Sequence, residues 1–552
     1  MEAIAVVLTW VIFGAYLAFL AVAGLYARKK TKTLRDFMVA GRSIGPLLLG
    51  VSFGVTYFSA VMVVGGGAYS WSFGISTLWI AGLNTLAGVV GFYIFFGKRT
   101  RALGEHLDSM TVPQLLGERY KEKKLQSLTA IVILVFQTIY VMSIYQGLAT
   151  LLHVVIPGFT ETAFIISTVL VGIITVIYLN VGGSHGAIFT DALESVVILV
   201  GILVIFGVGL YFVGGFQGLI SGLQDIENTT PDLNTGDLTA FPGVFGLGMI
   251  GMVSVTSFGV WGMPQMITRF YTAKESKTLR WGLVISACWA FAVAFFAWFN
   301  GAIARVFFYG EPLYTTINDV GGETAIPWLM VETLPIVAGL IMAAVTAASL
   351  TSGEKIILMA ASSFSIDFYQ EKTKASDDKT LKVTRIVSTI VVVIGVVGSI
   401  IVLLGNLVAI LDLCMFAWAA MCSVILVPYI MGLFWKKGTG KAAFWSGLIG
   451  LIFAVIQFFC FYAKGRSLWF GLYPEILGEI ASIPLATIDI LGFTEFTVSL
   501  AYLHPFLVGP PISLVLFIII SYFDKDGAPP KEYLKELFTA MKEEETIIEQ
   551  AK

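Results

Sequence analysis

Small and polar residues recur on one face of an apolar stretch around residue 350. They are spaced three, four and seven positions apart, so a helix would place them on the same side: Ala348, Thr351, Ser352 and Lys355. Carbonyl and hydroxyl oxygens are the ligands that hard cations prefer. This face could therefore hold a cation such as Na⁺, although the two hydroxyls could instead bond carbonyls one turn earlier in the same helix.

A second polar interruption falls in a hydrophobic run near the N-terminal end of the chain. Glycines, hydroxyls and β-branched residues break the run at Gly54-Val-Thr-Tyr-Phe-Ser-Ala60 and again at Gly65-Gly66-Gly67. Inside a membrane, unwound backbone is tolerated where it lines a cavity, and its freed carbonyl oxygens become cation ligands. Close helix packing through small residues would produce the same pattern.

Two adjacent charged residues, Glu354 and Lys355, interrupt the stretch around residue 350. A charge at the centre of a membrane helix costs roughly 2.5–3.5 kcal/mol even on a permissive insertion scale, so a functional reason is expected. About 18 Å of helix separates Lys355 from Asp367, the next charged residue along the chain. Because a lysine side chain cannot reach that far, Lys355 requires a buried acidic partner. Asp191 and Glu194 are the first candidates, and Asp412 lies at the wrong depth.

These residues must be positioned by membrane helices. Hydrophobic residues make up 57% of the 552-residue chain and charged residues 13%, which leaves too little polar surface for a soluble globule. A helix crosses a bilayer with roughly 20 apolar residues. The sequence predicts an all-α polytopic membrane protein with about 13 transmembrane helices, near residues 3–27, 45–72, 75–97, 126–155, 160–180, 190–214, 244–268, 281–308, 333–365, 383–404, 407–435, 441–463 and 505–523.

The basic residues predict the orientation, because loops rich in Lys and Arg remain cytoplasmic. They fall on alternate loops, at residues 28–42, 98–124, 269–280, 372–385 and 436–441. We therefore expect a multi-pass plasma-membrane protein with its N-terminus outside and its C-terminus in the cytoplasm. The short connecting segments predict one transmembrane domain over residues 1–523, followed by a cytoplasmic tail over residues 524–552.

One cytoplasmic segment, from Thr111 to Lys124, has two interpretations. It could be an interfacial helix with Leu115 and Leu116 facing lipid and with Arg119, Lys121 and Lys123 facing headgroups. It could equally be an ordinary solvated connector.

Four motifs follow one another in a fixed order along the chain. They are Asp36-Phe-Met-Val-Ala-Gly-Arg-Ser43, Tyr178-Leu-Asn-Val-Gly-Gly183 with Ala187-Ile-Phe-Thr-Asp191, Trp261-Gly-Met-Pro-Gln-Met-Ile-Thr-Arg269, and Ala417-Trp-Ala419 with Pro428. Over approximately residues 5–435 the chain resembles the sodium:solute symporter family of proline, pantothenate, monocarboxylate, sialic acid and sugar carriers. The resemblance implies a leucine-transporter-type inverted repeat, in which helices 2–6 (residues 43–214) recur upside down as helices 7–11 (residues 244–435).

The resemblance also implies a sodium site that coincides with the two polar interruptions. Its ligands would be three backbone carbonyls and two hydroxyls, those of Val55, Phe58, Ala348, Thr351 and Ser352. Five neutral oxygens suit Na⁺ and would tie the broken second helix to the ninth.

The expected solute site departs from the well-known branches of the family. Proline-type members carry an Asp where this chain has Tyr57, and sugar-type members carry Glu-Gln where it has Val61-Met62. The remaining cavity would be aromatic with few polar groups, lined by Tyr57, Ser59, Tyr145, Gln146, Trp261 and Pro264. Such a cavity favours a compact, partly apolar solute, an amino acid or a monocarboxylate.

The function that follows is secondary active symport, in which inward Na⁺ movement drives uptake of a small organic solute by alternating access. Asp191, Glu194, Glu354 and Lys355 would then form a static ion pair network that locks the inner gate. The alternative is a proton-coupled, Na⁺-independent transporter in which the Lys355 ammonium group takes the place of Na⁺.

A membrane-embedded enzyme is a remote alternative, because the four histidines are scattered and the spans contain no paired-acid metal motif. The expected partners are the solute, Na⁺ and the lipid bilayer. Neither a nucleic acid nor a bound cofactor is expected, and the sequence does not specify an oligomeric state.

Overall fold

Apolar helices make up most of the chain, because inside lipid every backbone N–H and C=O must be satisfied within the segment. The computed structural model describes residues 43–57, 61–154, 161–181, 183–241, 246–319, 321–333, 335–405, 407, 410–469, 473–490 and 494–549, with isolated positions between 11 and 18. Within this part, eight helices are long and apolar enough to cross a membrane, or nine if one bent pair counts as a span. The first of the 13 predicted spans, residues 3–27, lies almost wholly outside the described residues.

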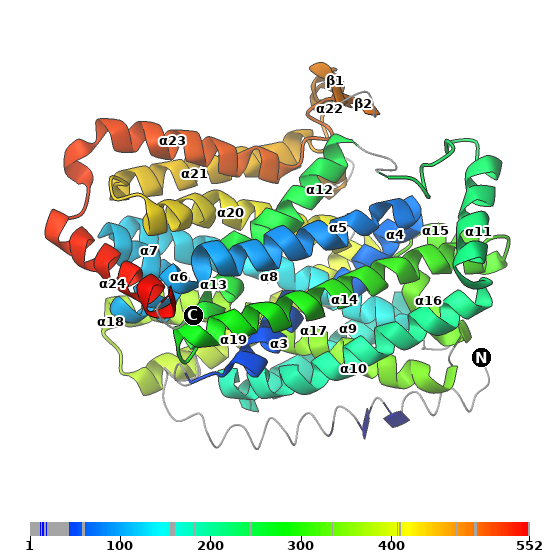
Figure 1. Cartoon of the computed structure of the whole chain (residues 1–552), viewed down its shortest axis with the longest axis horizontal. Coiled ribbons are helices and arrows are strands. Elements are labelled where there is room, and N and C mark those ends of the chain that lie inside the picture. Colours follow the sequence, from blue (N-terminus) through cyan, green and yellow to red (C-terminus); the bar gives the residue numbers. More distant parts are fainter. Residues whose placement is uncertain are drawn as a thin grey trace.

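The long helices lie side by side along the bundle (Figure 1). In the first half they are α3 (Pro46–Tyr57), α4 (Gly67–Phe73), α5 (Leu78–Leu83), α6 (Lys98–His106), α7 (Val112–Tyr120), α8 (Lys123–His153), α9 (Glu161–Val181), α10 (Gly183–Phe212) and α11 (Gly215–Thr229). In the second half they are α12 (Leu247–Phe258), α13 (Pro264–Thr272), α14 (Ser276–Phe308), α15 (Pro312–Asp319), α16 (Ala325–Thr333), α17 (Pro335–Phe364), α18 (Glu371–Thr373), α19 (Asp377–Leu404), α20 (Ile410–Phe434), α21 (Gly440–Ile456), α22 (Glu475–Ser482), α23 (Gly509–Phe523) and α24 (Lys531–Glu549). A short antiparallel hairpin, β1 (Ala486–Ile490) with β2 (Thr494–Val498), follows α22. Helix α11 stands across one end of the bundle, whereas α22 projects from it together with the hairpin (Figure 1).

The first broken helix begins as α3 and ends at Tyr57, and its continuation starts as a π-helical segment, Val61–Gly66, before α4. Residues 58–60, where the sequence predicts the interruption, fall outside the described residues. The chain then reverses at Gly74, whose φ of 67° is strained for any residue with a Cβ atom. The reversal is visible along α14, where Arg305 bonds the Trp71 carbonyl and Ser286, nearer the start of the same helix, bonds Tyr93.

A second broken helix opens the other half of the chain. The segments Leu247–Gly262 and Pro264–Thr272 meet at an angle of 43°. Pro264 occupies the first turn of α13, where its missing N–H is no loss, and this allows the helix to restart after the bend. Each predicted repeat, residues 43–214 and 244–435, therefore begins with a discontinuous helix.

Small residues set the closest helix contacts. A Cβ atom on Gly301 of α14 would collide with the Gly67 carbonyl of α4, and one on Gly67 would collide with Ile326. Association of membrane helices depends on van der Waals packing, which these glycines permit by letting the backbones approach. They hold α4, the second part of the first broken helix, against α14.

The outward-facing side chains are apolar, as lipid requires. On α19 one stripe repeats every three or four residues and is 50–60% exposed: Ile386, Ile390, Val393, Val397 and Ile401. Exposed aliphatic stripes of this length would be costly in water. The predicted all-α polytopic membrane protein is thereby supported at the level of individual helix faces.

The segment from Thr111 to Lys124 corrects the sequence analysis in part: residues 112–120 form the helix α7, and Lys121 and Lys123 are exposed, but its leucines and Arg119 face the protein interior. Leu115 and Leu116 of α7 are each 1% exposed, and Arg119 is fully buried. Arg119 donates to the carbonyls of Gly432 (2.8 Å) and Trp435 (3.1 Å), so it satisfies the free C-terminal carbonyls of α20. Hydropathy does not reveal such a role, because the acceptor is 313 positions away in the sequence.

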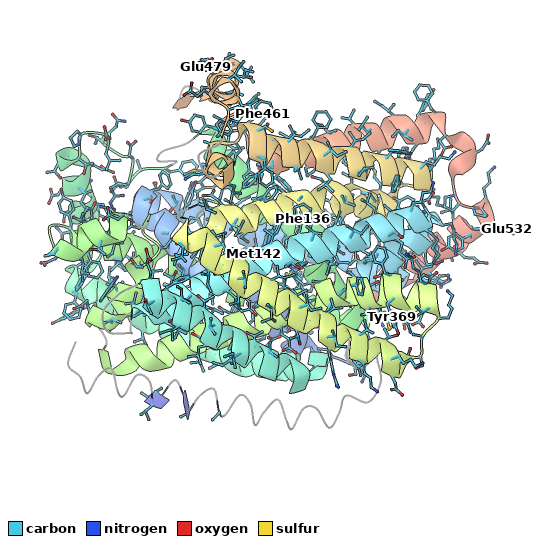
Figure 2. All side chains as sticks on the ribbon, turned by 180° about the vertical axis from the view of Figure 1, so that it is seen from behind. Phe136, Met142, Tyr369, Phe461, Glu479 and Glu532 are labelled. Carbon is cyan, nitrogen blue, oxygen red and sulfur yellow. The ribbon has the colours of Figure 1, made fainter. Side chains whose placement is uncertain are left out.

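The predicted tail also forms structure, because residues 531–549 are the helix α24. Its apolar face is buried through Leu534, Leu537, Phe538 and Met541, and the helix packs on α6. Figure 2 shows Glu532 of α24 at the same end of the bundle as Tyr369, which follows α17. Phe136 lies in the middle of the bundle, whereas Phe461 and Glu479 belong to the part that includes α22.

Candidate functional site

A buried ion pair joins two long helices in the interior of the bundle. Lys355 Nζ of α17 lies 2.6 Å from Asp191 Oδ2 of α10, and the side chains are 7% and 0% exposed. The structure thus supplies a buried acidic partner for Lys355 at the first of the two positions that the sequence favours. Asp191 precedes Lys355 by 164 residues, so only the fold brings the two together.

Helix α3 completes the environment of this pair. Thr56 Oγ1 accepts from Lys355 Nζ at 3.0 Å and from Arg269 Nη2 at 3.1 Å, and it donates to the Ser52 carbonyl at 2.6 Å. One turn earlier on the same face, Ser52 Oγ donates to Asp191 Oδ2. Arg269 of α13 stands 4.0 Å from the same carboxylate oxygen. Four helices, α3, α10, α13 and α17, therefore meet at one polar cluster.

The cluster contains more acidic than basic groups. Glu194 and Glu354 are 0% and 2% exposed. Both interact electrostatically with Lys355, and Glu354 also interacts with Asp191 and Glu194. Among the described side chains, the three carboxylates of Asp191, Glu194 and Glu354 therefore face two cationic groups, those of Lys355 and Arg269. Among the described residues, Glu354 Oε2 has no hydrogen-bond partner. Because an uncompensated buried charge is costly, such a cluster favours an additional bound cation or proton.

The predicted sodium ligands come from α3 and α17, and two of them are in contact. Ser352 Oγ donates to the Val55 carbonyl at 2.9 Å, and Ser352 is fully buried. The Ser352 hydroxyl therefore bonds across to α3. Ala348 and Thr351 belong to α17, but their side chains fall outside the described part of the chain, as does the whole of Phe58.

Tyr57 is the predicted solute residue at the end of α3, where the first helix break begins. Its hydroxyl donates to the Thr256 carbonyl of α12, and its ring stacks on Trp418 of α20 with centroids 6.4 Å apart. Tyr140 of α8 also contacts Trp418, edge-on, with ring centroids 5.7 Å apart. Within the described part, the buried indole nitrogen of Trp418 has no hydrogen-bond partner. Trp418 and Tyr140 are site candidates that the sequence analysis missed, because aromatic residues within a span usually serve packing.

Other predicted solute residues contact different helices. Trp261 donates its Nε1 proton to the Ala87 carbonyl at 3.0 Å and packs edge-on against Phe96 and Phe258, each at 5.1 Å. Tyr145 is buried against Gly395 of α19. Trp261 and Tyr145 thus have packing partners outside the Tyr57 and Trp418 cluster.

Three further predicted solute residues complete the set. Gln146 is buried on α8, and Pro264 begins α13, where its carbonyl accepts from Thr268 Oγ1 at 2.9 Å. Ser59 lies outside the described residues. The structure therefore does not gather all six predicted residues around one described contact.

A buried amide pair is a second feature that sequence reasoning missed. Gln137 Nε2 of α8 donates to Gln265 Oε1 of α13 at 2.6 Å, and both side chains are at most 3% exposed. Gln265 directly follows Pro264 at the second helix break. Uncharged amides leave almost no mark on hydropathy, so only their mutual contact identifies them as polar groups of the interior.

The sequence is similar to known transport proteins over most of its length. The chain matches the sodium:solute symporter family over residues 37–450. It is 26% identical to the osmoregulated proline transporter OpuE of Bacillus subtilis (strain 168) over 85% of this chain and 92% of that protein. It is also 26% identical to a sodium/proline symporter of Staphylococcus aureus (strain JH9), over 86% of this chain and 91% of that protein.

Solved structures show the same fold at low sequence identity. A Na⁺-coupled sialic acid symporter in its substrate-bound outward-open state superposes with a TM-score of 0.68, at 18% identity, over 94% of this chain and 97% of that one. The nucleobase-cation-symport transporter Mhp1 superposes with a TM-score of 0.51, at 14% identity, over 91% and 98% of the two chains. These likenesses confirm the leucine-transporter-type architecture. The chain is a multi-pass membrane transporter, not an enzyme, and belongs to the sodium:solute symporter family.

Proposed function

We propose that this protein is a secondary active symporter that couples inward Na⁺ movement to uptake of a small organic solute. The contact that carries the proposal is the 2.9 Å hydrogen bond between Ser352 Oγ and the Val55 carbonyl. It places a hydroxyl and a carbonyl oxygen side by side at the junction of α3 and α17. A cation that bound both oxygens would tie a broken helix to a continuous one, and this is how ion binding stabilises one state of such transporters.

The solute class follows from the aromatic cluster and from the relatives. Tyr57, Trp418 and Tyr140 offer stacked and edge-on rings with few polar groups, which suits a compact, partly apolar molecule. An amino acid or a monocarboxylate fits that description. Two relatives are named as proline carriers, which supports the amino acid.

The ion pair of Lys355 and Asp191 serves best as a lock on the inner gate. It joins α17 to α10, and Thr56 extends the link to α3, so the helices that must separate for inward release are held together. The pair lies one helical turn beyond Ser352, toward the end of the bundle that α24 covers. In the orientation we propose, that end is cytoplasmic and the N-terminus is outside.

One observation favours a second candidate, proton-coupled transport without Na⁺. The Lys355 ammonium group has three oxygens within hydrogen-bond distance, both carboxylate oxygens of Asp191 at 2.6 Å and Thr56 Oγ1 at 3.0 Å. An oxygen shell of this kind resembles that of a bound cation. If Lys355 released its proton during the cycle, a pH gradient could drive uptake.

The deciding experiment is uptake of labelled solutes by the purified protein in proteoliposomes. One set of vesicles carries an inward Na⁺ gradient at equal pH, and the other carries a pH gradient with no Na⁺ on either side. We expect uphill accumulation in the first set alone. Accumulation in the second set would overturn the sodium proposal in favour of proton coupling, and accumulation in neither would overturn both.

A further inference from the structure

A cavity of about 500 Å³ opens at the end of the bundle opposite α24. It is lined from α4, from the starts of α12 and α20, and from three connecting segments, around Glu323, around Lys464 and around Tyr502. The residues that matter for its chemistry are Tyr69, Glu323, Asp412, Tyr462 and Lys464. Asp412 stands at the start of α20, and Gly432 near the end of that helix contacts Arg119 of α7, about 30 Å away along the helix. The volume is within the range of small-molecule sites.

The walls of this cavity are acidic and aromatic. Among its described lining residues, Glu323 and Asp412 are the carboxylates and Lys464 is the basic side chain. Lys464 Nζ lies 3.8 Å from Asp412 Oδ2, with side chains 62% and 13% exposed. Glu323 accepts the backbone N–H of Ile410 at 2.8 Å, which fixes the loop before α16 to the start of α20.

The cavity leads toward the aromatic cluster described above. Met252 lines the cavity, and Thr256, one turn further along α12, is bonded by Tyr57. Met415 lines the opposite wall, and Trp418, one turn further along α20, stacks on the same Tyr57. The cavity therefore ends about one helical turn from the Tyr57 and Trp418 pair, so a solute that enters here approaches the helix breaks.

We propose that this cavity is an outer subsite for an amino acid, in which Asp412 binds the ammonium group and Lys464 binds the carboxylate. Tyr69 and Tyr462 would contact the apolar part and the ammonium group through their rings. A monocarboxylate would meet two carboxylates and a lysine that is already paired, so like-charge repulsion disfavours it. The inference rests on the proposed solute transport and decides between its two solute classes.

The test uses the reconstituted full-length protein with Asp412→Asn and, as a matched control, Glu311→Gln, an exposed carboxylate after α14. The half-saturating concentrations of L-proline, L-alanine and Na⁺ are measured, together with inhibition by lactate and pyruvate. In Asp412→Asn we expect the half-saturating amino acid concentration to rise about tenfold or more, because a hydrogen bond to a charged group is lost. The Na⁺ requirement and the control should match the wild type.

Lys464→Gln gives an independent readout, and this exposed residue can be replaced without loss of folding. It should weaken competition by L-proline but leave competition by L-prolinamide, which lacks the carboxylate, unchanged. Unaltered amino acid affinity in both variants, or a change in the Na⁺ requirement alone, would overturn the subsite. Wild-type preference for lactate would overturn the amino acid assignment. Failure of the sodium proposal is distinct, because the wild type would then show no Na⁺-driven uptake at all.

Discussion

Lys355 Nζ and Asp191 Oδ2 lie 2.6 Å apart with both side chains buried, in the interior of a bundle of predominantly apolar helices. Attraction between two charges is strong in such an environment, and so is the cost of leaving one of them alone. The pair is therefore best probed by removing one partner and then the other.

Lys355→Met should lower the thermal stability of the purified protein, because it removes the nearer cationic partner of Asp191 and leaves Arg269 at 4.0 Å; breaking a buried pair costs about 3–5 kcal/mol. Adding Asp191→Asn should restore part of the loss. Thermal unfolding in detergent measures both effects. Lys374→Met, which breaks an exposed pair with Glu371, is the control and should change little. Equal stability of Lys355→Met and wild type would contradict a locking role.

Ser352→Ala should raise the half-saturating Na⁺ concentration for uptake about tenfold, equivalent to ~1.4 kcal/mol, because one proposed ligand oxygen is lost. Initial uptake rates over a range of Na⁺ concentrations provide the measurement. Ser363→Ala is a matched control on the same helix, since Ser363 is buried and bonds its own helix at Met359. Identical Na⁺ curves for the two variants would rule out Ser352 as a ligand.

Trp418→Ala should raise the half-saturating solute concentration roughly tenfold, because it removes the ring that stacks on Tyr57. Trp261→Ala should act mainly on folded yield, since Trp261 packs between Phe96 and Phe258. Comparing uptake kinetics with the amount of folded protein separates the two effects. A larger loss of solute affinity in Trp261→Ala than in Trp418→Ala would instead assign the solute contact to Trp261, as the sequence analysis expects.

The stability of the protein should depend on pH through Asp367, which lies just beyond α17. Burial raises its pKa to about 7, although Gln126 Nε2 (2.8 Å) and Thr111 Oγ1 (3.2 Å) donate hydrogen bonds that oppose the rise. The folded state then holds this proton more tightly than the unfolded state does. Stability is greatest below the unfolded pKa and falls as pH rises from about 4 to about 7.

Asp367→Asn should remove that part of the pH dependence, because the amide keeps the polar contacts and cannot ionise. The melting temperature at pH 5 and pH 8 is the measurement, with Asp378→Asn, an exposed carboxylate of α19, as the control. The difference between the two pH values should shrink in Asp367→Asn alone. If both variants behave like the wild type, Asp367 does not titrate in this range.

Several properties could be predicted from the sequence because their causes are local. Apolar runs specify membrane helices wherever they fold, and glycines with hydroxyls weaken a helix at the position where they occur. The position of Lys355 in an apolar span predicted a buried acidic partner, because the cost of burying a charge does not depend on which helix supplies the opposite charge. The four motifs, through their resemblance to a known family, also predicted the leucine-transporter-type fold, which the comparisons confirm.

The remaining features depend on which helix faces meet, and only the tertiary structure decides that. It selected Asp191 as the direct partner of Lys355, buried Arg119 at the end of α20 and stacked Trp418 on Tyr57. These contacts join residues far apart in sequence. Hydropathy and periodicity describe one helix at a time, whereas the site forms where several helices pack, and the packing depends on the shapes of all of them.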